Sequence, residues 1–376
     1  ESTKMKSFLK ALALVLVLMI GITAPGFAGD TIKLGSGGVI SGDLAPYGIS
    51  AVRGVEIAIE DINAKGGILG KKIELLVGDD VCKPEVAVNM ATKLVSDGAQ
   101  MIVGHVCSGA TIAANKIYKD AGLIIVSPAS TNDDLTLKGE HPNFFRTISY
   151  DGAQAALMTS YVKNDLKVKT VALIHDKGDY GKGQMELARK LFEKLGGVEV
   201  VLFEGVTTGA VDYSAIVQKI KRSKAQLTMW GGYHSDASKI VGMIKKKKVN
   251  TIFFGADGII GDNFVQLAGK YSDGVYATGP NDTSNNPLYK EISAKHQKKY
   301  GEAPGTFFHN GYACVQALAA AAEKAGSLDY DKMRAAMFEI QVDSPLGPIG
   351  FDKNGDVIGA GFSVYQVQNG KYTQVN

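Results

Sequence analysis

Apolar segments and amphipathic segments alternate along most of this chain, and that alternation limits the folds open to it. Strand-like runs such as residues 72–80 are followed by helix-like runs such as residues 84–98, where Pro84 suits the first helical turn. Repeated strand–helix units of this length predict parallel sheets flanked by helices. The series begins near residue 31, pauses at residues 149–152 and resumes. We therefore predict an α/β fold with two doubly wound lobes.

The last third of the chain departs from this rhythm. Residues 287–340 look largely helical. The tail from Gly347 alternates apolar and polar residues, with Asn-Gly pairs at 354–355 and 369–370. Such pairs between alternating runs are typical of β-hairpins.

The first 28 residues have the order of a secretory signal peptide. Lys6 and Lys10 form a basic start, residues 12–20 are an unbroken apolar run, and Gly26 and Ala28 are small residues at a suitable cleavage point. The run is short for a membrane span, which needs about 20 residues. We expect export to the periplasm with cleavage near Ala28, and an uncleaved anchor is the alternative. The four residues before Met5 look like an over-extended start.

The charge and the length restrict the partners and the domain count. Loss of residues 1–28 would take away three lysines and one glutamate, so the formal net charge would fall from +3 to +1. A nearly neutral protein is a poor partner for nucleic acid or for an anionic membrane. The 376 residues exceed the usual size of one domain, so two domains are expected.

Loops that directly follow the predicted strands are the candidate binding loops, because doubly wound sheets bind small ligands at the carboxyl ends of their strands. In the first series these loops cover residues 35–48, 107–111 and 127–134. Their candidate residues are Tyr47, Ser108, Ala129, Ser130 and Thr131.

Ser108 begins a predicted helix immediately after a strand. Unpaired N–H groups and the helix dipole favour an anion there, so a carboxylate or a phosphate would fit. The alternative for Ser108 is a plain N-cap serine. The alternative for Tyr47 is an ordinary surface tyrosine. The loop after the first strand fails the dinucleotide spacing because Ile40 stands where a glycine is needed, and the chain has no G-K-[ST] phosphate loop. We expect no cofactor.

In the second series the loops after strands cover residues 175–183, 231–236 and 255–258. They present two tyrosines, Tyr180 and Tyr233, and one carboxylate, Asp257. Aromatic faces together with one acid suit a small amphipathic cation.

The three cysteines admit two readings. Cys82 and Cys107 each follow a predicted strand, and adjacent parallel strands would bring them to one rim at bridging distance, so export favours a disulfide. The alternative is a Cys107 nucleophile with His105, two residues away on a predicted strand, as its base. The histidine and cysteine spacings give no zinc motif, so no metal site is expected. Cys314 lies in an apolar helix and is expected to be a buried free thiol.

Five segments together resemble the periplasmic leucine/isoleucine/valine-binding proteins of ABC transporters. They keep the order of that family and span nearly all of the mature chain: residues 61–88, 104–111, 127–136, 175–183 and 231–236. The resemblance implies a type I periplasmic binding protein that captures an amino acid between two lobes and delivers it to a membrane permease. It further implies a monomer, no enzymatic activity, and a hinge of three crossings near residues 149–152, 279–282 and 356–361. The lobes would then be residues 29–149 plus 282–356 and residues 150–281 plus 357–376.

The resemblance also implies residue roles. Ser108 and Thr131 match the groups that hold the ligand carboxylate, while the Ala129 carbonyl, Thr131 and Asp257 match those that hold its ammonium. The bridge matches Cys82–Cys107. The side-chain wall would comprise Tyr47, Val106, Tyr180, Tyr233 and Tyr312. Asp257 stands where the family's best-known members carry glutamate, which implies a longer or water-mediated contact. Other amino acids, short amides, urea or aromatic acids are therefore alternative ligands, and a ligand-sensing role is an alternative function.

Overall fold

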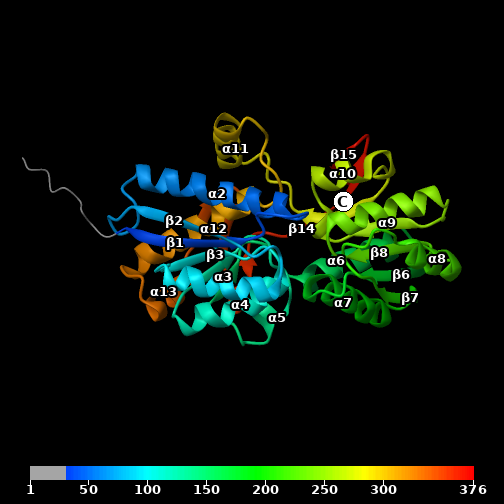
Figure 1. Cartoon of the computed structure of the whole chain (residues 1–376), viewed down its shortest axis with the longest axis horizontal. Coiled ribbons are helices and arrows are strands. Elements are labelled where there is room, and N and C mark those ends of the chain that lie inside the picture. Colours follow the sequence, from blue (N-terminus) through cyan, green and yellow to red (C-terminus); the bar gives the residue numbers. More distant parts are fainter. Residues whose placement is uncertain (1–30) are drawn as a thin grey trace, which may run out of the picture. The chain divides into compact units, whose positions relative to one another are not determined.

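Five parallel strands form the first sheet of the computed structural model, which describes residues 31–376. The segment expected to be a signal peptide lies outside the described residues. The strands are ordered β2-β1-β3-β4-β5, with Leu34 of β1 paired to Leu75 on one side and Met101 on the other (Figure 1). Their bounds are β1 Ile32–Gly38, β2 Ile73–Asp79, β3 Met101–Gly104, β4 Ile125–Ser127 and β5 Phe144–Arg146.

Helices cover both faces of this sheet. One hydrophobic cluster joins the sheet to α2 and α12, for example through Val55 and Leu318, and a second joins it to α3 and α4 through Ala91 and Ala114 (Figure 1). The helices that lie between β1 and β5 in the chain are α2 Ala45–Ala64, α3 Pro84–Ser96, α4 Ser108–Asp120 and α5 Asp134–Leu137. Late in the chain follow α11 Pro287–Tyr300, α12 Phe308–Ala325, α13 Tyr330–Met337, and a small antiparallel sheet of β11 Val342–Ser344, β12 Gly347–Phe351 and β13 Val357–Ile358. We call these elements together the first lobe.

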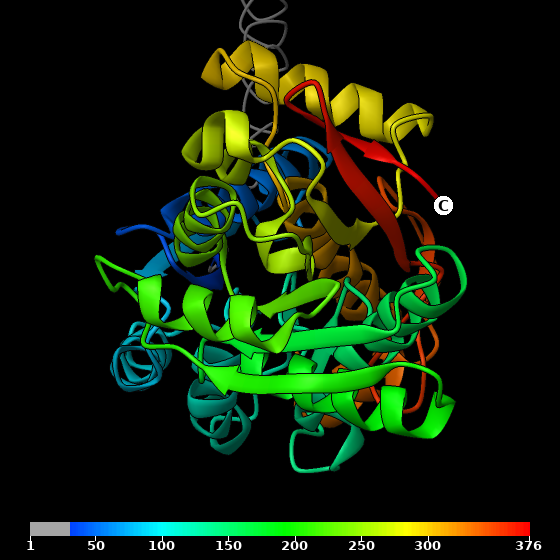
Figure 2. The ribbon, with the colours of Figure 1, turned by 90° about the vertical axis from the view of Figure 1, so that its right-hand side faces the viewer.

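The second sheet is mostly parallel and has the order β15-β14-β10-β9-β8-β6-β7. Its C-terminal hairpin, which turns at Asn369-Gly370, supplies the two antiparallel strands at one edge (Figure 2). Its strands are β6 Thr170–His175, β7 Glu199–Gly205, β8 Leu227–Gly231, β9 Ile252–Gly255, β10 Tyr276–Pro280, β14 Phe362–Gln368 and β15 Lys371–Gln374. Its helices are α6 Asp151–Asn164, α7 Asp179–Leu195, α8 Ser214–Ser223, α9 His234–Lys246 and α10 Asp262–Ala268, with 3-10 turns η1 Asp257–Ile259 and η2 Gly269–Tyr271. We call these elements the second lobe.

The α/β fold with two mostly parallel sheets confirms the prediction from the strand–helix rhythm. The largely helical region and both Asn-Gly hairpins are confirmed as well. The chain passes between the sheets three times: from β5 to α6, from β10 to α11, and from β13 to β14.

Helix α2 begins at Ala45, so Tyr47 lies in its first turn. Proline in the first turn needs no N–H partner, so Pro46 fits the start of this helix. Gly48 permits the close approach of this turn to the preceding loop, because a Cβ there would lie 1.8 Å from the Val39 carbonyl oxygen.

Helices α2 and α12 touch backbone to backbone. A Cβ on Gly54 would lie 2.0 Å from the Phe308 carbonyl oxygen, and one on Gly311 would lie 2.3 Å from that of Ala51. The contact brings the first turn of α2 beside the start of α12, so that the rings of Tyr47 and Phe307 have centroids 5.7 Å apart.

Candidate functional site

A cavity of about 270 Å³ lies where loops of the two lobes meet. Seven residues expected from the sequence line it: Tyr47, Val106, Ser108, Ala129, Tyr180, Tyr233 and Asp257. Gly258 and Phe307 complete the lining.

Ser108 sits at the N-terminal end of the 13-residue helix α4. Cys107 occupies the cap position in an extended conformation and makes no side-chain cap, so the plain N-cap alternative for Ser108 does not apply. The Ser108 hydroxyl accepts a hydrogen bond from the Asn132 N–H at 3.3 Å and is 2% exposed. A hydroxyl beside open helical N–H groups is a suitable place for a carboxylate.

The loop after β4 contributes in three different ways. Ala129 lines the cavity, and no hydrogen bond within residues 31–376 engages its carbonyl oxygen. The Ser130 side chain stabilises the loop itself, because its Oγ bonds the His105 carbonyl at 3.0 Å and Thr111 Oγ1 at 2.5 Å. Thr131 is fully buried, and its Oγ1 has no hydrogen-bond partner among the described residues. Neither Ser130 nor Thr131 belongs to the lining of the cavity.

Asp257 supplies the acid on the opposite side, just after β9. Its Oδ1 accepts hydrogen bonds from the Tyr180 hydroxyl at 2.6 Å and from Gln154 Nε2 at 3.0 Å. Burial raises the pKa of Asp257, and these two hydrogen bonds oppose the rise. A cation that binds beside a buried carboxylate of this kind would strongly stabilise its charged form.

A second buried acid was missed in the sequence. Asp151 opens helix α6 and is fully buried, and burial followed by the charge of Asp257 raises its pKa. Gln154, one turn later, links the same helix to Asp257. Asp151 and Gln154 lie where the chain passes between the lobes. That position was the only feature of the sequence that could have indicated their role.

Aromatic rings form the rest of the wall. The rings of Tyr180 and Tyr233 have centroids 5.3 Å apart, and Tyr233 lies 6.5 Å from Tyr47. The backbone carbonyl of Tyr233 accepts a hydrogen bond from the indole of Trp230 at 3.3 Å.

Tyr312 does not reach this wall. Its hydroxyl donates to Asp61 Oδ2 at 2.8 Å, and its ring packs into the core between α2 and α12. The wall position on α12 is instead held by Phe307, which caps the helix with a φ of +68°. Nothing in the sequence pattern marks an aromatic residue for that conformation.

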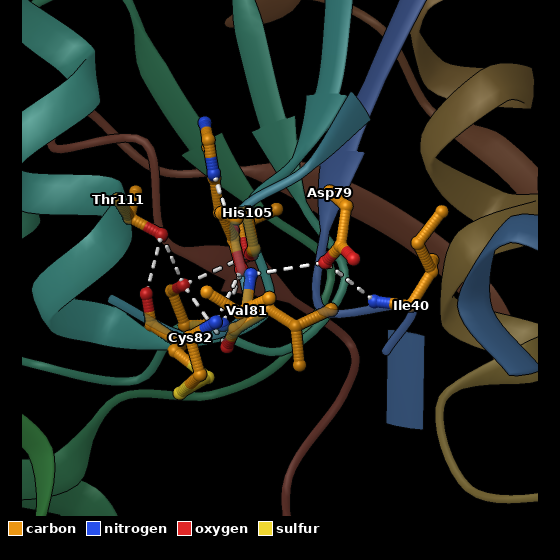
Figure 3. Close-up of a disulfide and its surroundings, with 11 residues drawn as sticks. Ile40, Asp79, Val81, Cys82, His105 and Thr111 are labelled. Atoms are coloured by element: carbon orange, nitrogen blue, oxygen red, sulfur yellow. Dashed lines mark hydrogen bonds and ion pairs between the residues drawn. A yellow bond between two sulfur atoms is a disulfide. The ribbon is translucent and has the colours of Figure 1, made fainter. Parts of the chain in front are cut away.

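The disulfide between Cys82 and Cys107 is present, with Cα atoms 5.5 Å apart (Figure 3). The expected reason was wrong, because β1 lies between β2 and β3. The loop after β2 instead folds across the end of β1, where Asp79 Oδ1 accepts from the N–H groups of Ile40 and Val81 (Figure 3). Val81 and Cys82 both have positive φ, which is strained for a β-branched residue such as valine.

The cysteine–histidine pair proposed as a nucleophile does not form. Strand β3 ends at Gly104, before His105, and Cys107 is used in the disulfide. The buried His105 bonds Asp80 Oδ2 through Nδ1 at 2.7 Å and the Tyr118 hydroxyl through Nε2 at 3.0 Å. Cys314 is a buried free thiol, as expected, and burial raises its pKa to about 12.

A larger cavity of about 1430 Å³ adjoins the first and shares Tyr180 and Tyr233 with it. The disulfide and the acidic side chains of Asp176 and Asp179 lie along it. A hydrogen bond joins the lobes beside Asp179, whose carbonyl accepts from Asn132 Nδ2 at 2.7 Å. Ser108 and Asp257 line the smaller cavity together, and neither lines the larger one.

Within residues 31–376, no group of three or more histidine, cysteine or acidic side chains is placed to hold a metal ion. No helix in that range is long and apolar enough to cross a membrane.

Comparisons with known proteins agree with this geometry. The sequence model of a family described as periplasmic binding protein matches residues 31–371. The leucine-, isoleucine-, valine-, threonine- and alanine-binding protein of Pseudomonas aeruginosa is 34% identical over 346 residues, covering 92% of each chain. Among solved structures, the leucine-binding protein LivK of Thermotoga maritima has a TM-score of 0.86 at 24% identity and covers 92% of this chain and 98% of its own. LivJ of Streptococcus pneumoniae, solved with isoleucine, has a TM-score of 0.81 at 29% identity, covering 92% of this chain and all of its own.

Proposed function

We propose that this chain, which belongs to the periplasmic binding protein family, captures an amino acid in the periplasm and delivers it to the membrane permease of an ABC transporter. Leucine, isoleucine and valine are the expected ligands. The similarity to the Pseudomonas aeruginosa protein supports this choice, as does the likeness to the isoleucine complex of LivJ. We assign the protein no catalytic activity.

The observation that carries the proposal is the polarity of the small cavity. Ser108 and the start of α4 lie on its first-lobe side, and Asp257 lies on its second-lobe side. An α-amino acid is a zwitterion, so its carboxylate would meet the helix start and its ammonium would meet Asp257. Thr131, which the resemblance also matches to a ligand contact, is buried but lies outside the lining of this cavity.

The lobes of this proposal are residues 29–149 plus 282–356 and residues 150–281 plus 357–376, although β13 at residues 357–358 pairs with β12 and so belongs to the first lobe. Hydrophobic packing supports the assignment, since Ile292 and Phe351 pack in one cluster with Ile32. A further cavity of about 380 Å³ is lined by residues from all three chain passages, including Ser149, Asn281 and Ala360. Its place supports a hinge made of these three passages.

Ligand binding and lobe closure would be coupled, because neither lobe holds all of the contacts. A binding protein for scavenging needs a Kd near 1 μM, or about 8 kcal/mol. Hydrogen bonds to charged groups contribute about 1.5–3 kcal/mol each, and burial of a leucine-sized side chain adds a similar amount. Ser108 alone or Asp257 alone cannot supply that sum, so the ligand favours the closed arrangement. The closed arrangement is then the form that a permease would recognise.

A thermal-shift screen tests the proposal. The panel contains all common amino acids together with urea, short amides and aromatic acids, and each hit is followed by titration calorimetry. We expect leucine, isoleucine or valine to raise the Tm. If these three leave the Tm unchanged while another compound raises it, the ligand assignment is wrong; if no compound binds, the binding function itself is wrong.

A further inference from the structure

Tyr47 of the first lobe reaches into the second lobe and is held there by two groups. Its hydroxyl lies 2.8 Å from the Gly258 carbonyl oxygen and 2.6 Å from His234 Nδ1. The two rings meet edge to face, with centroids 4.8 Å apart. Both side chains are buried, at 2% exposed for Tyr47 and 1% for His234. The contact is therefore a dry connection between the lobes.

Counting hydrogens fixes the direction of this short chain of bonds. A tyrosine hydroxyl has one hydrogen, and a carbonyl oxygen can only accept. Tyr47 must therefore donate to Gly258, and the hydrogen between Tyr47 and His234 must come from Nδ1 of the imidazole. Burial lowers the pKa of His234, while a backbone hydrogen bond to Asp43 and the charges of Asp43 and Asp236 oppose that decrease.

The peptide that receives this bond is itself part of the site. Gly258 follows Asp257 directly, and its N–H donates to the Tyr180 hydroxyl at 2.8 Å. Tyr180 also holds the Asp257 carboxylate. The acid that faces the ligand is thus held by Tyr180 from within the second lobe, and its neighbouring carbonyl is held by Tyr47 from the first lobe.

We propose that His234 is a positioning residue that prolongs the closed state, by orienting the Tyr47 hydroxyl toward Gly258 across the two lobes. This inference rests on the proposed function and adds a determinant of ligand release to it. His234 itself is absent from the lining of the cavity, so it acts through Tyr47.

Opening of the lobes must break the Tyr47–Gly258 bond, whereas ligand entry into the open form need not. Loss of the His234 donor should therefore act on the dissociation rate. Truncating one member of a buried hydrogen-bonded pair changes koff more than kon in interfaces of this kind. We expect an increase in koff of about threefold to tenfold, with kon within about twofold of wild type.

The experiment measures release of radiolabelled leucine during a chase with unlabelled leucine. His234→Leu and Tyr47→Phe should each accelerate release, and the double variant should be no faster than the faster single variant, because both break one chain of bonds. His234→Asn places an amide N–H near the position of Nδ1 and should restore koff to within about twofold of wild type. His175→Leu is the matched control, since His175 is also buried in the second lobe but its ring hydrogen-bonds only the Lys177 N–H among residues 31–376.

Wild-type koff in His234→Leu, additive effects in the double variant, or failure of His234→Asn to restore slow release would each overturn the inference. A ligand-independent measurement separates it from the proposed function. In ¹⁵N NMR of histidine side chains, His234 should show the Nδ1–H tautomer, and Tyr47→Phe should abolish that preference. If the wild-type protein binds no leucine, the proposed function fails, and the tautomer still decides whether the His234–Tyr47 bond exists.

Discussion

Arg146 and Asp356, which are 210 positions apart, form a buried ion pair with 2.6 Å between Nε and Oδ1. The guanidinium of Arg146 also donates to the carbonyls of Ser130 and Asn132, on either side of Thr131. One side chain therefore connects the loop beside the cavity to the segment near the third chain passage.

Removal of the acid should be costly. Asp356→Ala would leave the Arg146 charge buried without its partner, and breaking a buried pair in this way costs about 3–5 kcal/mol. Denaturant unfolding measures the change. Asp97→Ala, which breaks the exposed pair with Lys93, is the control and should cost less than about 1 kcal/mol. Equal small losses in both variants would show that the buried pair does not stabilise the fold.

Ser108→Ala should weaken leucine binding at least tenfold. The variant removes a hydroxyl from the proposed carboxylate position, and a hydrogen bond to a charged group contributes about 1.5–3 kcal/mol. Calorimetry measures the affinity. Ser130→Ala is the comparison. Among residues 31–376, the Ser130 hydroxyl bonds the scaffold groups of His105, Val106 and Thr111, so its loss should lower the Tm of the ligand-free protein more than Ser108→Ala does. An unchanged affinity in Ser108→Ala would exclude Ser108 from the site.

Asp257→Asn should separate binding from stability. The amide keeps an acceptor for Tyr180 but loses the charge, so leucine affinity should fall at least tenfold. The same change should raise the Tm of the ligand-free protein at neutral pH, because it removes a carboxylate whose pKa is raised by burial.

The pH dependence follows from the direction of that pKa shift. A carboxyl group with a raised pKa in the folded state stabilises the fold when protonated, and this contribution is lost as the pH rises through that pKa. The stability advantage of Asp257→Asn over wild type should therefore grow from pH 4 toward neutrality. Thermal melts across that range measure it, and an advantage that shrinks with rising pH would contradict the assignment.

Loss of the disulfide should destabilise the protein by about 3–4 kcal/mol, as expected for a bridge between residues 25 positions apart. Guanidinium unfolding with and without reductant measures the difference. The double variant Cys82→Ser with Cys107→Ser should not respond to reductant. Titration of denatured, unreduced wild type should find one thiol, that of Cys314, and finding three would exclude the bridge.

The sequence predicted the architecture well because hydrophobic periodicity reports burial directly. It placed Ser108 and Asp257 correctly as residues that follow strands, since the sheet topology brings such loops together. It failed where a residue's role depends on backbone conformation or on long-range packing. Phe307 caps α12 with a positive φ, and Tyr312 turns toward Asp61 because α12 lies against α2. Neither feature produces a periodic pattern of apolar residues in the sequence.

The chain contains one tryptophan, and its position allows its fluorescence to report on the wall of the cavity. Trp230 is fully buried at the end of β8, and its indole N–H bonds the backbone of Tyr233, whose ring lines the cavity. Indole emission depends on the polarity and hydrogen bonding around the ring. Any rearrangement of the Tyr233 segment would therefore alter a fluorescence signal that has a single source, without any attached dye.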